Sequence, residues 1–145
     1  MTKNFKSKKI REVRKELTNF LKSQDGISKV KQDGECILFE VNNGIKLIAC
    51  IAHDGTVTDK ETKEVSNFFQ LSLRRFVRIN RKQFKKAANA LAIFGVAIMH
   101  EKEDIYQLIC PVGSSCDDIS SIYNLNGGII QMIKSGKAVY EALEE

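Results

Sequence analysis

The chain has 145 residues, the size of one domain, and its 43% hydrophobic and 28% charged residues exclude an intrinsically disordered protein. The longest apolar run, from Ala90 to Met99, is about half of what a membrane helix needs, and the lysine-rich N-terminus lacks the apolar core of a secretion signal. We therefore expect a single domain over residues 1–145, a cytoplasmic location and no membrane partner.

The net charge of +5 is unevenly distributed along the chain. Residues 3–31 hold ten Lys or Arg against three acidic residues, residues 74–86 hold seven with no acidic residue, and the rest of the chain sums to −9. Two basic segments on an otherwise acidic chain fit a contact surface for a polyanion or an acidic partner, or alternatively solvated helix faces. The candidate contact residues in the second segment are Arg74, Arg75, Arg78, Arg81, Lys82, Lys85 and Lys86.

The first elements are predicted from two different periods of apolar residues. Spacings of three and four predict an amphipathic helix over residues 5–24, which ends at Gly26. Branched and aromatic residues on both sides of Asn42, Asn43 and Gly44 then predict a β-hairpin formed by residues 34–41 and 45–52.

The register of this hairpin depends on the length of its turn. A two-residue turn would pair Val41 with Lys46, whereas a three-residue turn pairs Val41 with Ile45 and Glu40 with Lys46. We favour the three-residue turn because it places opposite charges across from each other and apolar residues together.

The same register places Cys36 opposite Cys50, close enough for the two to be linked under oxidation. The four cysteines of the chain form no Cys-x-x-Cys pair, and we expect all of them to be reduced thiols in the cytoplasm.

The middle of the chain continues the sheet and leads into a second helix. We expect His53, Asp54 and Gly55 to form a turn, followed by a polar connection over residues 56–64. Residues 65–79 fit both a strand and a helix, and we favour a strand. Asn80 and Gln83 then resemble a capping arrangement for a helix that runs to about residue 93 and stops at residue 95.

The C-terminal third predicts a second hairpin and a long helix. Residues 96–100 and 105–110 flank a charged turn, and Ser114 or Ser115 is expected to cap the last helix. Asp117 and Asp118 would lie in its first turn, where carboxylates suit the helix dipole.

The predicted order is helix, three strands, helix, two strands, helix, which indicates an α+β domain with a mainly antiparallel five-stranded sheet. This order, clearest from Asn80 to Leu143, resembles the type III secretion chaperone-like fold, which includes the YbjN family. The resemblance implies a small cytoplasmic protein, often homodimeric, that binds protein partners and lacks enzymatic activity. Unlike the typically acidic secretion chaperones, this chain has a basic balance.

No residue pattern predicts a catalytic, metal or cofactor site. His100 and Glu101 lack the second His of a zinc-protease helix. His53 with Asp54 fits an ordinary turn as well as a general base. We therefore expect no enzymatic activity, no metal and no cofactor.

Residues 113–116 lead into the predicted N-terminus of the last helix, where backbone N–H groups can receive an anion. Asp117 and Asp118 follow at once, and their negative charge opposes such binding. We favour simple capping here.

Two functions remain from the sequence. We favour a non-enzymatic protein-binding adaptor or chaperone-like module that forms a homodimer. The alternative is a nucleic-acid-binding protein that uses the basic segments 3–31 and 74–86, with Phe76 available to stack on bases.

Overall fold

The computed structural model describes residues 9–42, 44–116 and 124–144. The elements are α1 (Ile10–Ser23), β1 (Ile27–Asp33), β2 (Cys36–Val41), β3 (Ile45–Thr58), β4 (Val65–Arg78), the 3₁₀ turn η1 (Arg81–Gln83), α2 (Phe84–Leu91), the 3₁₀ turn η2 (Ala92–Phe94), β5 (Ala97–Lys102), β6 (Ile105–Cys116) and α3 (Leu125–Leu143). The protein is therefore α+β, as predicted, with α3 the longest of the described helices. None of the described helices has the length and apolarity needed to cross a membrane.

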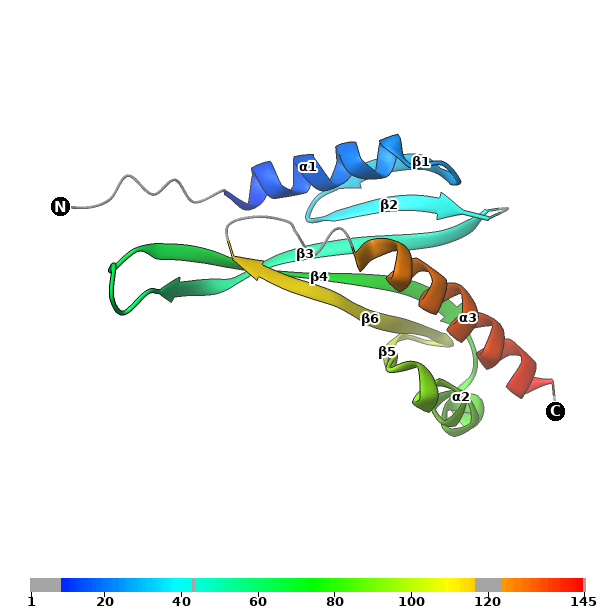
Figure 1. Cartoon of the computed structure of the whole chain (residues 1–145). Coiled ribbons are helices and arrows are strands. Elements are labelled where there is room, and N and C mark those ends of the chain that lie inside the picture. The colour runs from blue at the N-terminus through cyan, green and yellow to red at the C-terminus, as the bar shows by residue number, and fades with distance from the viewer. Residues whose placement is uncertain (1–8, 43, 117–123, 145) are drawn as a thin grey trace.

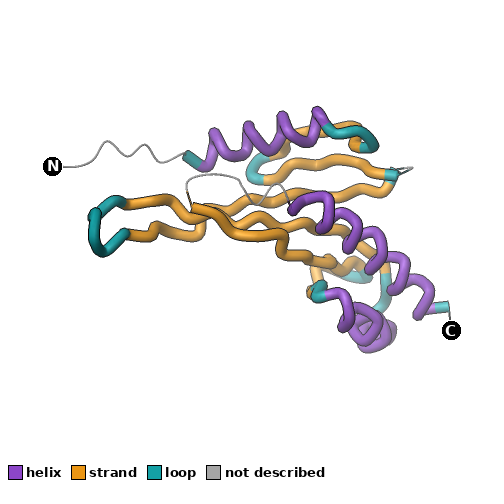
Figure 2. The backbone as a smooth tube through the Cα atoms, viewed as in Figure 1, coloured by secondary structure: helices purple, strands orange, loops and turns teal. Residues whose placement is uncertain are grey.

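All strands join one antiparallel sheet in the order β1-β2-β3-β4-β6-β5, seen as a continuous layer in Figure 2. Figure 1 shows α1 running along β1 and β2, and α3 running along the other half of the sheet. Among the described strands, neighbours in the sheet are also consecutive along the chain, except for β4 and β6.

Alternation of side chains along the strands sends one set of residues into the core. Ile37, Phe39 and Val41 on β2 are buried. So are Leu47, Ala49 and Ile51 on β3, and all six belong to one hydrophobic cluster with side chains of all three helices. The even-numbered side chains of these strands remain half-buried or exposed. All three helices therefore cover the same face of the sheet, and the described residues leave the other face open.

The predicted β2–β3 register is confirmed. Val41 pairs with Ile45, Glu40 with Lys46, and Cys36 with Cys50. The period-2 pattern and the charge pair were therefore sufficient to determine the turn length.

The predicted count of five strands is wrong, because Ile27–Asp33 forms a sixth strand, β1, at the edge of the sheet. Its pairing with β2 shifts between Ser28 and Lys31, and Lys29 adopts a positive φ of 53°. The two half-buried apolar residues of the strand, Ile27 and Val30, are three positions apart because the bulge lies between them. The segment therefore lacks the alternation of apolar and polar residues by which a strand is predicted.

The expected turn at His53, Asp54 and Gly55 is also wrong, since these residues continue β3. The chain accommodates them by a register shift between His53 and Thr56, with Gly55 at a φ of 115°. β3 and β4 consequently extend into a long hairpin whose tip projects beyond the rest of the sheet in Figure 1.

The predicted strand at residues 65–79 and the capping arrangement before α2 are confirmed. Asn80 and Gln83 exchange side-chain-to-backbone hydrogen bonds of 2.9 and 3.0 Å, which form a capping box. Gly95 ends the helical segment with a left-handed φ of 66°.

The second hairpin is confirmed, but β6 is longer than expected. Ser114 and Ser115, the predicted capping positions, lie within this strand and pair with β4. The last helix begins at Leu125, and the predicted positions of Asp117 and Asp118 fall outside the described residues.

Candidate binding surface on the open sheet face

The face of the sheet that the helices leave uncovered, here called the open face, combines apolar and basic side chains. Leu38 and Ile48 pair directly across β2 and β3, and both are half-buried. Phe76 on β4 leaves 46% of its surface exposed. A single exposed apolar residue is ordinary, but Phe76 lines the same hollow as Leu38 and Ile48, and a shared apolar surface of this kind indicates a surface for contact.

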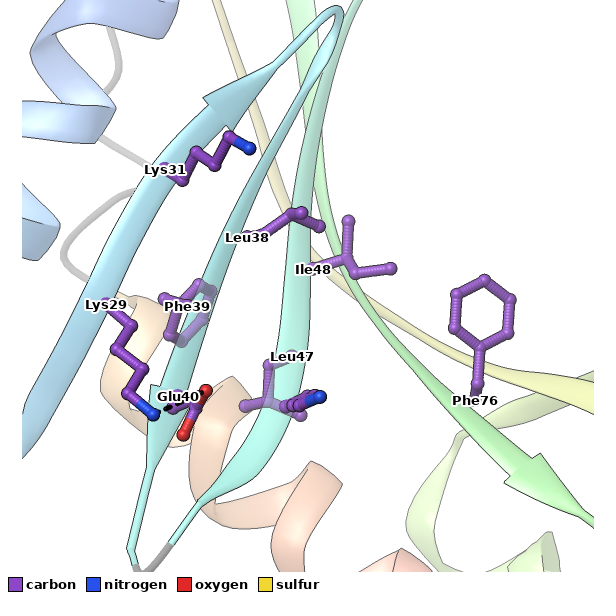
Figure 3. Close-up of a pocket in the computed structure, with 9 residues that line it drawn as sticks. Lys29, Lys31, Leu38, Phe39, Glu40, Leu47, Ile48 and Phe76 are labelled. Carbon is purple, nitrogen blue, oxygen red and sulfur yellow. Dashed lines mark ion pairs between the residues drawn. The ribbon is translucent and has the colours of Figure 1, made fainter.

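A hollow of about 470 Å³ lies on this face, shown in Figure 3. We call it the lysine groove. Leu38, Ile48 and Phe76 supply its apolar wall, and three lysines with one glutamate stand around it. Its lining residues are Lys29, Lys31, Leu38, Phe39, Glu40, Lys46, Leu47, Ile48 and Phe76.

The charge of the lysine groove is predominantly positive. Lys29 Nζ lies 3.6 Å from Glu40 Oε2, and Figure 3 shows this ion pair at the β1–β2 side of the groove. Lys31 and Lys46 form no ion pair with any described residue. One carboxylate against three ammonium groups leaves a net positive field over an apolar surface.

The seven basic residues singled out in the sequence do not form one surface. Alternation along β4 places Arg74 and Arg78 on the open face and Arg75 under the helices. The other four lie in η1 and α2, all with exposed side chains: Arg81, Lys82, Lys85 and Lys86.

Arg74 is held in place on the open face by a side chain of β6. Its Nη1 donates a hydrogen bond of 2.8 Å to Gln107 Oε1, and Gln107 Nε2 donates to Glu101 Oε2 at 3.4 Å. The Nε of Arg74 is buried without a hydrogen-bond partner among the described residues. Arg74 also lines a second hollow, of about 440 Å³, together with Cys50 and Ser72.

Arg75 has a structural role. Its Nη1 donates a 3.3 Å hydrogen bond to the carbonyl oxygen of Met132 in α3. A Cβ atom added to Gly136 would fall 2.7 Å from Arg75 Cζ, so the absence of a side chain at Gly136 leaves room for the guanidinium.

The two histidines have separate hydrogen-bond partners. His53 Nε2 lies 2.9 Å from Asn67 Oδ1, while Asp54 Oδ2 accepts a hydrogen bond from Gln70. His100 Nε2 lies 2.9 Å from the carbonyl oxygen of residue 103. The described residues contain no group of three or more His, Cys, Asp or Glu side chains that could hold a metal ion.

The lysine groove was missed from the sequence, although part of its signal was present. The favoured hairpin register already paired Glu40 with Lys46 and, two residues further on, Leu38 with Ile48. The contributions of Lys29 and Lys31 depend on β1, which the sequence analysis did not predict.

A scan against protein-family models and searches of curated proteins and of solved structures found no match to this chain.

Proposed function

We propose that this protein is a non-enzymatic binding module whose open face holds a segment of a partner protein that carries apolar and acidic side chains. The observation that carries the proposal is the lysine groove, in which a wall of Leu38, Ile48 and Phe76 stands beside lysines. The resemblance of the element order to chaperone-like proteins supports the same role.

The composition of the groove selects the chemistry of the partner. Leu38, Ile48 and Phe76 would gain from removal of their apolar surface from water. Lys31 and Lys46 would pair with carboxylates at the rim, where charges favour association and orientation more than affinity. An amphipathic acidic segment satisfies both demands, whereas a basic segment would be repelled.

The test uses two short labelled peptides, one alternating Leu with Glu and the other alternating Leu with Lys. We expect the Leu/Glu peptide to bind, as measured by fluorescence anisotropy, and the Leu/Lys peptide not to bind. Phe76→Ala should weaken binding of the Leu/Glu peptide roughly 5- to 30-fold, the range for loss of an aromatic anchor.

Phe84→Ala is the matched control. Phe84 is also partly exposed, at 37%, but it lies on α2 and contacts Tyr106 away from the groove. Its replacement should leave peptide binding unchanged. Equal binding of both peptides, or equal loss in the Phe76 and Phe84 variants, would contradict the proposal.

One observation favours nucleic-acid binding as a second candidate. Phe76 lies between Arg74 and Arg78 on the open face, and an exposed aromatic ring beside guanidinium groups can stack on an unpaired base. In that case labelled single-stranded RNA would bind at low salt. The logarithm of its association constant would fall with the logarithm of the salt concentration, with a slope of about 0.7 per phosphate contact. Arg74→Ala and Arg78→Ala would reduce this slope, while a protein-binding module predicts little affinity at any salt concentration.

We further propose that the module is a homodimer, paired through its helical surface so that the open face stays available. Ile93 is 86% exposed and Ile130 is 51% exposed, and the hydrogen bond from Gln131 Nε2 to the Phe94 carbonyl joins the segments that carry them. Exposed apolar residues on neighbouring segments are typical of contact surfaces.

We expect sedimentation to give twice the 16.4 kDa mass of the chain, and Ile93→Lys to shift it to the monomer. Val57→Lys, at an exposed apolar residue on the projecting hairpin, should leave the mass unchanged. A monomeric wild-type protein at micromolar concentration would contradict the homodimer.

A further inference from the structure

The open face also carries two thiols directly opposite each other on neighbouring strands. Cys36 on β2 pairs with Cys50 on β3, and their Sγ atoms lie 2.9 Å apart. Opposed residues in an antiparallel pair have Cα atoms about 4.5–5.5 Å apart, within the range that a disulfide spans. The backbone therefore needs no rearrangement to bring the two sulfur atoms within bonding reach.

The surroundings of the pair distinguish it from Cys110. Cys36 and Cys50 are half-buried on the open face, and Cys50 lines the hollow beside Arg74. Cys110 is buried among core residues, and its Sγ donates a hydrogen bond of 3.7 Å to the carbonyl oxygen of Pro111. A small reagent can thus approach the pair from the open face.

We propose that Cys36 and Cys50 form a cross-strand dithiol that a low-molecular-weight disulfide such as oxidised glutathione converts into an intramolecular disulfide. The thiolate of one cysteine attacks one sulfur of the reagent, forms a mixed disulfide and releases one glutathione thiolate. The other cysteine then gives its proton to solvent and attacks the protein sulfur of the mixed disulfide, which releases the second glutathione. The protein loses two electrons and two protons, and the reagent is reduced to two thiols.

The two thiols of the pair interact with each other. Burial and the hydrogen bond with Cys36 raise the pKa of the Cys50 thiol to about 12. The mixed disulfide formed in the first step removes this hydrogen bond, and the second attack occurs between sulfur atoms that already face each other.

The disulfide would join two strands of the sheet next to the lysine groove. Leu38 and Ile48 are the next pair along the same face of the same two strands. A covalent bond between Cys36 and Cys50 would hold β2 and β3 together at the end away from their turn. This inference does not depend on the proposed function, because it concerns the thiols alone.

The test treats the folded protein with oxidised glutathione, blocks the remaining thiols with an alkylating reagent and maps tryptic peptides without reduction. Cleavage after Lys31, Lys46 and Lys60 leaves Cys36 and Cys50 in separate peptides, 32–46 and 47–60. We expect these two peptides to appear joined in the wild-type protein, with no glutathione on either.

Cys50→Ser and Cys36→Ser should instead each keep glutathione on the remaining cysteine of the pair. Cys110→Ala is the matched control and should form the joined peptides as the wild type does. A wild-type protein that keeps glutathione on Cys36 or Cys50 without forming the link would overturn the proposal.

Discussion

Phe39→Ala is expected to lower the free energy of unfolding by about 3–5 kcal/mol, the usual range for removal of a buried phenylalanine. Phe39 is only 2% exposed and lies among the largest fully buried side chains of the core. Its loss would leave a cavity beneath the helices, because close-packed neighbours fill such a space only in part. Urea unfolding monitored by circular dichroism measures the change.

The neighbouring residue provides the control for this substitution. Leu38 lies next to Phe39 on the same strand, but its side chain is half-buried on the open face. Leu38→Ala should therefore cost only about 1 kcal/mol, since less apolar area returns to water and no enclosed cavity forms. If the two substitutions cost the same, the assignment of one covered face and one open face would be wrong.

Gly136→Ala is expected to destabilise the protein by up to about 1 kcal/mol, although alanine is normally the better helix former, because the added methyl group meets the flexible end of the Arg75 side chain. The added methyl group would displace the Arg75 guanidinium and break its hydrogen bond to the Met132 carbonyl oxygen. Gly127→Ala, also in α3, is the matched control, because a Cβ atom at Gly127 would meet nothing within 4 Å. That control should be neutral or gain up to about 1 kcal/mol.

The cause of the Gly136 effect can be isolated with a second substitution at Arg75. In an Arg75→Ala background the guanidinium is absent, so Gly136→Ala should lose most of its cost. A double-mutant cycle, measured by thermal unfolding, gives the interaction energy between the two substitutions. Additive effects of the two substitutions would show that Arg75 and Gly136 do not meet.

The sequence was informative where a local pattern matches one regular element. The three-residue hairpin register followed from the charge pair Glu40 and Lys46, and the capping box of Asn80 and Gln83 marked the start of a helical segment. In both cases the residues concerned are close in sequence and lie in one local element, so the local sequence pattern is sufficient to predict the structure.

The sequence failed where a bulge interrupts the period. The bulge in β1 hides a strand, and the bulge after His53 makes a continuing strand look like a turn. The distribution of the basic segment 74–86 over different surfaces could not be predicted from charge counts, because such counts ignore the alternation of side chains along a strand. Arg74 and Arg75 are adjacent in sequence but lie on opposite faces of the sheet. The structural role of Arg75 depends on its hydrogen bond to α3, which is distant in sequence.

The lysine-bearing edge strand has a consequence for how the protein avoids unwanted assembly. A strand at the edge of a sheet can template another chain through its free backbone groups, and proteins counter this with lysines, bulges and irregular backbone. β1 combines all three, with Lys29 at a positive φ, Lys31 beside the register shift and a largely exposed polar surface. Two of the three lysines of the groove, Lys29 and Lys31, thus also make this edge a poor template for aggregation.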